Sequence, residues 1–591
     1  MSIVLEIKAK VAIVLKELYG YEASGAELTI NSTKPEFEGD YTLVMFSFVK
    51  QLKKSPEQLG NEIGEALVKA SPELFTGFNV IKGFLNLTIA DNYWINFLQS
   101  NYHQPRFGFK APNGQKVMVE YSSPNTNKPL HLGHLRNNFL GWSVAQILKE
   151  SGYEIIKSCI VNDRGIHICK SMIAWQKFAN GATPESAGVK GDHFVGEYYV
   201  KFNDAYKAEV DKLVSEGIDK ATAEKEAPIM KETQQMLQDW EAGKPEVIEL
   251  WKMMNSWVYA GFDVTYKRIG SDFHKMYYES DTYLLGKQFV EEGLQKGVFY
   301  KKEDGSVWID LTAEGLDEKL VLRKDGTSVY ITQDIGLAQQ KYDEFKYDQS
   351  LYVIADEQNY HMKVLKLILQ KLGKPFADGV YHLSYGMVEL PTGRMKSREG
   401  TVVDADDMVE EMVNVARQKT EELGKVKDFT EAELKELYDT IALGALKFFL
   451  LRVDPKKKMI FNPEESIDFH GFTGPFVQYT HARIKSVLRK AEVTRNNAQG
   501  TGLLKLEKDL IVLLELYPTI LEQAVAEHNP SVIAIYVFNL AKAFNTFYTE
   551  HSVMNAESEE KKQLRLQVSE MTANVIASGM SLLGIRVPER M

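Results

Sequence analysis

The chain has 591 residues, which suggests roughly three or four domains, and its hydrophobic (44%) and charged (26%) fractions are ordinary for a globular protein. Its formal net charge of −11 argues against indiscriminate nucleic-acid binding, although a locally basic face could still hold a nucleic acid. Because the sequence shows no membrane-length apolar run, no secretion-signal pattern and only two cysteines (Cys159 and Cys169), we expect a cytoplasmic enzyme without a membrane partner.

The first region, residues 1–112, begins with an amphipathic helix at Ile3–Leu18 and continues through short mixed segments to a strand at Gly83–Ile89. Proline and glycine are frequent in Pro105–Gly114, a composition typical of a linker. The mixture of elements predicts a separate α+β domain at residues 1–112.

The second region, residues 113–390, alternates apolar strands with helical stretches, a pattern typical of a parallel sheet in an α/β fold. The predicted strands include Lys116–Tyr121, Glu154–Val161 and Leu351–Ile354. Lys, Glu and Gln dominate an insertion at about residues 185–250, where we expect a solvated helical hairpin. A third region, 391–455, carries a basic loop followed by helices, and a fourth, 456–591, is helical throughout.

Residues 119–138 contain the most informative motif of the chain. A β-type run breaks at Pro124 and Pro129 and delivers His131-Leu132-Gly133-His134 to a helix start. Unpaired N–H groups and the positive end of a helix dipole make such a turn an anion site. The two histidines share one helical face and can both donate to phosphate oxygens, while Gly133 leaves room for a flat ring such as a nucleobase. The motif therefore predicts a nucleotide-phosphate site.

The alternative is that the histidine pair binds a metal or is merely exposed. A structural zinc site requires further Cys or His partners at ligand spacing, and the chain offers only Cys159 and Cys169. We therefore expect no zinc and no other protein-bound metal.

A glycine-bounded loop at residues 393–400 carries the cations Arg394, Lys396 and Arg398. Glycine flanks would let the loop close over a triphosphate, where the cations could stabilise charge developing on pyrophosphate. Taken alone, the segment favours a solvated basic loop.

The fourth region combines cations with flat rings. Its cations include Lys456, Lys457, Lys458, Lys485, Arg489 and Lys490, and its rings include Phe476, Tyr479 and His481. Cations that follow phosphates and aromatics that stack on unpaired bases are typical of single-stranded RNA binding. Spacing alone slightly favours a helical bundle with core aromatics and a charged exterior.

The motif at 119–138 resembles the first signature, His-Ile-Gly-His, of class I aminoacyl-tRNA synthetases. Ser123-Pro124-Asn125, Lys128-Pro129 and Leu135-Arg136 are most similar to the arginyl-tRNA synthetases. Residues 393–400 resemble the second signature, Lys-Met-Ser-Lys-Ser, but Ser397 stands where many members carry a catalytic lysine. Residues 471–483, 540–548 and 583–591 resemble the anticodon-binding domain of the same family.

The resemblance implies a fold for the whole chain. It implies a Rossmann-type class I catalytic domain at 113–390, followed by the second-signature loop and connecting helices at 391–455. The N-terminal α+β domain (1–112) would contact tRNA, and residues 456–591 would form an all-α anticodon-binding domain. Contacts to tRNA would come from Lys456, Lys457, Tyr479 and Arg483.

The resemblance also implies roles for the residues of both signatures. His131 and His134 would stabilise the reacting phosphates, while Lys128, Lys396 and Arg398 would draw off pyrophosphate, Lys128 replacing the missing signature lysine. ATP, accompanied by Mg²⁺, would contact His131, Gly133, His134, Met395, Lys396 and Ser397.

An arginine pocket needs carboxylates and a flat wall, because a guanidinium is planar with five donors and no acceptor. The resemblance places Tyr330, Asp334 and Gln358 in such a pocket, with Glu279 as a second carboxylate. Ser123, Asn125 and His134 would also contact the amino acid. Residues 326–334 are predicted to form a hairpin strand running into a helix. Taken individually, Tyr330 better fits a half-buried strand aromatic, Asp334 an N-cap or surface acid, and Gln358 a surface amide. Only the matched set, in this order along the chain, favours the pocket.

The implied function is activation of L-arginine with ATP, followed by transfer of the arginyl group to the terminal ribose of tRNA(Arg) by a monomer. Family behaviour also implies that tRNA must be present before the adenylate forms. Three other interpretations stay open: another class I ligase, such as one for glutamine or cysteine; a silent RNA-binding paralogue; and a simple nucleotidyltransferase, which has no use for residues 456–591.

Overall fold

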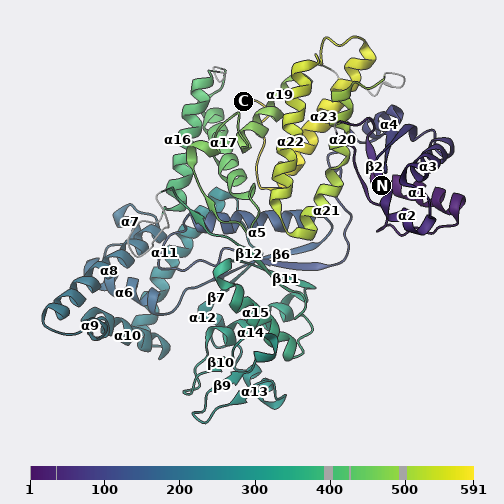
Figure 1. Ribbon diagram of the computed structural model, residues 1–591. Coiled ribbons are helices and arrows are strands. Elements are labelled where there is room, and N and C mark those ends of the chain that lie inside the picture. Colours follow the sequence, from purple (N-terminus) through teal and green to yellow (C-terminus); the bar gives the residue numbers. More distant parts are fainter. Residues whose placement is uncertain (1, 35, 392–402, 425–427, 492–501) are drawn as a thin grey trace.

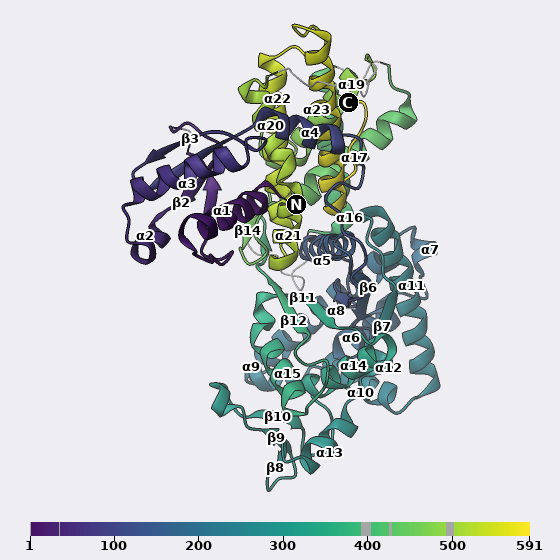
Figure 2. The ribbon, with the colours of Figure 1, turned by 90° about the vertical axis from the view of Figure 1, so that its right-hand side faces the viewer.

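The computed structural model describes residues 2–34, 36–391, 403–424, 428–491 and 502–591. A long helix, α5 (Leu132–Glu150), lies across the middle of the molecule, with the parallel sheet and its helices on one side and the C-terminal helices on the other (Figure 1). Turning the molecule shows the N-terminal domain standing to one side, next to the C-terminal helices (Figure 2). No helix within these described ranges combines the length and the apolar character needed to cross a bilayer.

The N-terminal domain packs helices on an antiparallel sheet of order β1-β2-β4-β3. Helix α1 begins after Ser2, whose side chain accepts the Leu5 N–H, and ends at Gly20 in the left-handed region (φ 64°). It therefore matches the predicted helix to within one residue. The strands are β1 (Ile30–Ser32), β2 (Tyr41–Val44), β3 (Phe75–Ile81) and β4 (Phe84–Ile89), and the helices are α1 (Ile3–Tyr19), α2 (Phe46–Leu52), α3 (Pro56–Ala70) and α4 (Asp91–Asn101).

The second region is built on a five-stranded parallel sheet of order β12-β11-β5-β6-β7. Since all strands run the same way, their carboxyl ends meet at one edge, where parallel sheets bind ligands. The predicted strands are confirmed in place, and Glu154–Val161 has the predicted bounds. The strands are β5 (Lys116–Glu120), β6 (Glu154–Val161), β7 (Lys275–Tyr278), β11 (Gln349–Ala355) and β12 (Val380–Tyr385).

The helical insertion between β6 and β7 has its own buried side chains. Phe194, Tyr198 and Trp240 are all buried, so the segment is more than the solvated hairpin expected at residues 185–250. The prediction rested on the high content of charged residues and overlooked the aromatic residues, which lie on the inward faces of long helices. The helices are α6 (Ile166–Phe178), α7 (Pro184–Ala187), α8 (Gly191–Ser215), α9 (Lys220–Glu226), α10 (Pro228–Glu241) and α11 (Pro245–Ile269).

The segment between β7 and β12 corrects another prediction. Residues 326–334 form no strand; a single bridge joins Leu322 to Ser328, and helix α14 begins at Tyr330, so Asp334 lies on the helix. The other elements here are α12 (Glu279–Thr282), α13 (Lys287–Gln295), β8 (Tyr300–Lys301), β9 (Val307–Ile309), η1 (Thr312–Glu314), β10 (Lys319–Leu322), α14 (Tyr330–Phe345), η2 (Asp356–Gln358) and α15 (Asn359–Lys371).

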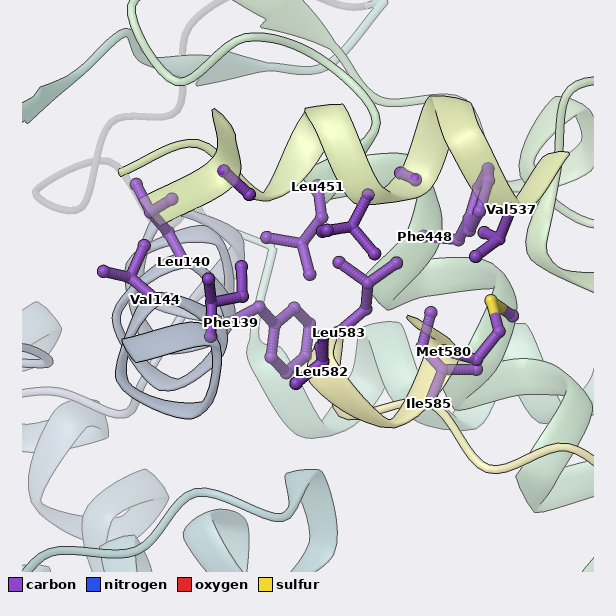
Figure 3. Close-up of a cluster of buried hydrophobic side chains, with 14 of the residues drawn as sticks. Phe139, Leu140, Val144, Phe448, Leu451, Val537, Met580, Leu582, Leu583 and Ile585 are labelled. Atoms are coloured by element: carbon purple, nitrogen blue, oxygen red, sulfur yellow. The ribbon is translucent and has the colours of Figure 1, made fainter. Parts of the chain in front are cut away.

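The C-terminal helices pack directly on α5. Phe139, Leu140 and Val144 of α5 belong to one hydrophobic cluster with side chains from later helices and from the turn after α23 (Figure 3), among them Phe448, Leu451, Val537, Met580, Leu582, Leu583 and Ile585. The elements are β13 (Val388–Glu389), α16 (Ala405–Leu423), α17 (Glu431–Leu451), β14 (Met459–Ile460), α18 (Pro463–Ser466), α19 (Gly474–Leu488), α20 (Lys505–Glu515), α21 (Tyr517–Glu527), α22 (Pro530–Glu550) and α23 (Glu559–Leu582).

The buried Arg136 ties α5 to the chain that follows the sheet. Its guanidinium donates to the carbonyl oxygens of Gly386 (2.7 Å), Pro455 (3.2 Å) and Lys457 (2.9 Å), and makes a longer contact to that of Met387 (3.4 Å). The first-signature helix is thus fixed from both sides, by apolar packing and by this buried cation.

Candidate active site

The loop between β5 and α5 is held in an unusual conformation. Ser122 (φ 79°) and Ser123 (φ 47°) both lie in the left-handed region, which costs free energy for residues other than glycine. Asn137 of α5 offsets part of this conformational cost. Its Oδ1 accepts the Ser122 N–H (2.5 Å), and its Nδ2 donates to the Val353 carbonyl (2.8 Å). The signature helix therefore fixes the loop that leads into it.

His131 and His134 form one unit at the start of α5. The Gly133 N–H donates to His131 Nδ1 (3.1 Å), the His131 N–H donates to His134 Nδ1 (3.1 Å), and the ring centroids are 3.9 Å apart. With both Nδ1 atoms accepting, each neutral ring carries its proton on Nε2. The site therefore offers two neutral N–H donors.

The electrostatic surroundings keep these rings neutral. Burial and the nearby Lys128 lower the pKa of His131 to about 3, and burial lowers the pKa of His134 well below its ordinary value. Burial also lowers the pKa of Lys128. At Gly133, an added Cβ would lie 3.0 Å from the His131 ring, so the missing side chain makes room for that ring.

The predicted second-signature residues Met395, Lys396, Ser397 and Arg398 lie outside the described residues. The chain that follows them is placed beside the first signature: the Leu132 N–H donates to the Val403 carbonyl (3.2 Å) and the Ala405 N–H donates to the Leu130 carbonyl (3.0 Å). Val403 and Ala405 are therefore hydrogen-bonded directly to the segment that carries His131.

A cavity of about 360 Å³, here called the smaller cavity, lies at the carboxyl ends of β5 and β11 against α14. Four predicted site residues line it: Ser123, Tyr330, Asp334 and Gln358. Tyr330 is 76% exposed, and Asp334 Oδ2 lies 2.6 Å from His361 Nε2. The structure thus brings together residues that the sequence separates widely.

Glu120 also lines the smaller cavity, although the sequence analysis did not assign it. It ends β5, is 4% exposed and pairs with Lys341 of α14. A signal was present, since a carboxylate ending an otherwise apolar buried strand is rarely tolerated without a partner or a function.

Asn125 and Glu279 line an adjoining cavity of about 840 Å³, here called the larger cavity, which shares Asn162 and Tyr330 with the smaller one. Burial raises the pKa of Glu279 to about 7, so its charge is weaker near neutral pH than that of an ordinary carboxylate. Glu279 lies near enough to Asp334 for that carboxylate's charge to contribute to the raised pKa of Glu279, and Glu120 is a further carboxylate on the smaller cavity.

Three family models match successive parts of the chain. The family model described as tRNA synthetases class I (R), catalytic domain, matches residues 97–462, the arginyl tRNA synthetase N terminal domain matches 5–89, and the DALR anticodon binding domain matches 477–591. This chain belongs to the class I arginyl-tRNA synthetases.

Relatives match this synthetase over its full length. The arginine–tRNA ligases of Parabacteroides distasonis and Bacteroides thetaiotaomicron are 52% and 53% identical to it, each over 100% of both chains. Among solved structures, the Thermus thermophilus arginyl-tRNA synthetase shares the fold, with a TM-score of 0.78 and 24% identity over 100% of both chains.

The remaining predicted residues of this synthetase lie in two places among the C-terminal elements. Lys456 and Lys457 are exposed in the turn before β14. Tyr479 and Arg483 of α19 line a groove of about 290 Å³ with Tyr548 and Arg590, and the Arg483 guanidinium lies 4.9 Å from the Tyr479 ring centroid. His481, expected to offer a flat ring, is instead buried, with Nδ1 3.0 Å from the Pro588 carbonyl.

Proposed function

We propose that this synthetase is an arginine–tRNA ligase that forms arginyl-adenylate from L-arginine and ATP and transfers the arginyl group to the 3′-terminal ribose of tRNA(Arg). The observation that carries the proposal is the smaller cavity, where Glu120 of β5 and Asp334 of α14 face one space beside the Tyr330 ring. Two carboxylates and a flat ring suit a planar cation with five donors. The full-length likeness to arginine–tRNA ligases supports the same substrate.

For the activation step, the phosphates of ATP would lie at the N-terminus of α5. His131 and His134 would donate through Nε2–H to oxygens that gain charge as pyrophosphate leaves, and a neutral donor at the positive end of a helix needs no proton transfer to act. Mg²⁺ would accompany ATP. Met395, Lys396, Ser397 and Arg398 would contact the phosphates from the second signature, with Lys128 in place of the missing signature lysine.

For the transfer step, the terminal nucleotides of tRNA would enter the larger cavity. Its lining includes the cations Arg164, Lys287 and Arg323 and the ring of Tyr283, and it meets the smaller cavity at Tyr330. Such a lining suits a single strand, because cations pair with phosphates and rings stack on bases. Ser123 and Asn125 lie where they could orient the amino acid toward the ribose.

Glu120 and Asp334 would also discriminate arginine from similar amino acids. Lysine would offer a single point charge in place of the planar fork that can pair with two carboxylates at once. Citrulline is neutral, so it would lose the charge attraction to Glu120 and Asp334. Anticodon bases would stack in the groove of Tyr479 and Arg483, while Lys456 and Lys457 would contact the tRNA backbone.

We further propose that the enzyme acts in the cytoplasm as a monomer. Light scattering on the purified chain checks the monomeric state.

Charging of total tRNA with each of the twenty radiolabelled amino acids tests the proposal. We expect label to be attached from arginine alone and to tRNA(Arg) alone. Charging with a different amino acid would contradict the assigned pocket, while tRNA binding without any charging would indicate a silent RNA-binding paralogue.

A further inference from the structure

Helix α14 lines the smaller cavity along one face, from the surface to the interior. Tyr330, Asp334, Leu337 and Lys341 follow each other at helical spacing, and all four line the cavity. Tyr330 is 76% exposed, whereas Lys341 is completely buried. The helix therefore carries an exposed ring, a carboxylate, an apolar side chain and a buried cation, in that order.

The buried cation has a specific partner. The Lys341 ammonium donates to Glu120 Oε2, and the side chains are 0% and 5% exposed. Two rings complete its surroundings, since Nζ lies 4.8 Å from the centroid of Tyr352 and 5.6 Å from that of Tyr277. Among the described residues, Glu120 Oε1 has no hydrogen-bond partner, and Glu120 lines the cavity.

A buried ion pair of this kind is costly to assemble, because both ions lose their hydration. Two apolar side chains of similar volume could fill the same space without that cost. Both members of the pair nevertheless line the smaller cavity. Packing alone does not explain why ions stand there, whereas binding a charged substrate would.

We propose that Lys341 is a positioning residue for amino-acid recognition: it holds Glu120 through Oε2, so that Oε1 is presented to the guanidinium of the substrate. This inference rests on the proposed function and deepens it. The charges are consistent with such a role, since Lys341 balances Glu120 and the cation of the substrate would balance Asp334. The substrate then enters a site that already has its final geometry.

The test compares three full-length variants in ATP–pyrophosphate exchange with tRNA present. Lys341→Met removes the charge at similar volume, and Lys341→Arg keeps it. Lys374→Met is the matched control, because Lys374 is also a largely buried lysine paired with a carboxylate (Glu292, 2.9 Å) and next to a ring (Phe289, 4.3 Å), yet it lines neither cavity.

We expect Lys341→Met to raise the KM for arginine by about 10- to 100-fold while the KM for ATP changes by less than about 3-fold, because one ionic contact is weakened. Lys341→Arg should restore most of the affinity, and Lys374→Met should leave both constants near those of the wild type.

A pH profile separates positioning from packing. The titratable and charged groups around Glu120 are Lys341, Tyr277, Tyr352, Tyr347 and Cys159, with Asp334 and His361 elsewhere in the cavity. Without Lys341, no neighbouring cation balances the negative charge of the buried Glu120 carboxylate, and a buried charge without a partner is costly. In Lys341→Met, the KM for arginine should therefore increase as the pH falls from 8 to 6, with a smaller increase in the wild type.

Two results would overturn the role of Lys341. One is a folded Lys341→Met enzyme with an unchanged KM for arginine; the other is an equal rise in both KM values with no pH dependence, which indicates packing alone. If Lys341→Met does not fold, Lys341→Gln, which donates to Glu120 without a charge, provides the same pH comparison. A wild type that activates a different amino acid refutes the proposed function itself, and the role of Lys341 with it.

Discussion

The stability of this synthetase should depend on pH through His193, at the start of α8. His193 Nε2 lies 3.2 Å from Asp404 Oδ2 and 3.1 Å from Asp406 Oδ2, both at the start of α16, and its side chain is 28% exposed. The hydrogen bonds to Asp404 and Asp406 raise the pKa of His193 to about 10. Asp192 and Lys190 complete the cluster, and Lys190 pairs with Asp406 as well.

The sign of the effect follows from linkage. A group whose pKa is higher in the folded chain stabilises fully below its unfolded pKa, here 6.5, and the stabilisation is lost as the pH rises toward 10. Each pH unit in this window removes at most about 1.4 kcal/mol, so the limit between pH 6.5 and 9.5 is about 4 kcal/mol. Because the side chain is partly exposed and Lys190 shares the carboxylates, we expect about 2–3 kcal/mol.

The assay is urea unfolding followed by tryptophan fluorescence at pH 6.5, 8 and 9.5, for the wild type and for His193→Gln. Burial lowers the pKa of Lys447 to about 8, an effect that makes stability rise with pH, so only the difference between the two proteins isolates His193. We expect His193→Gln to be less stable at pH 6.5 and the two curves to converge by pH 9.5. Parallel curves throughout would refute the reasoning.

Three further predictions concern the site and its support. Asp334→Asn should raise the KM for arginine about 30- to 150-fold in the exchange assay, less than a fully buried partner would, because the Asp334 side chain is 38% exposed; an unchanged KM removes Asp334 from the pocket. Lys128→Ala should slow activation about 100-fold and much more than Lys396→Ala, whereas equal modest losses contradict the replacement of the signature lysine. Arg136→Met leaves buried carbonyl oxygens without a donor, so it should lower the free energy of unfolding by about 3–5 kcal/mol in urea titrations. The control Arg268→Met breaks a more exposed pair with Asp439 and should lower it by about 1 kcal/mol. Similar losses in the two variants would contradict this ranking.

Local patterns predicted much of the fold. The apolar run Glu154–Val161 forms β6 with the expected bounds, because a strand buried in a parallel sheet is apolar along its length. Helix α1 matches as well, since a serine N-cap and a terminal glycine mark its ends. Residues 326–334 were harder, because the turn signal before Thr327 precedes a helix rather than a strand.

The candidate site was predictable where neighbours in the sequence act together, as His131 and His134 do. It was not predictable where partners are distant. Lys341 and Glu120 are 221 positions apart, and neither has a local motif that suggests the other. The same holds for His193 and Asp404, which come from different helical segments.

The most direct test of the central claim is amino acid-dependent ATP–pyrophosphate exchange with all twenty amino acids, with and without total tRNA. We expect exchange with arginine alone and only when tRNA is present. Exchange with another amino acid, or none under any condition, would contradict it.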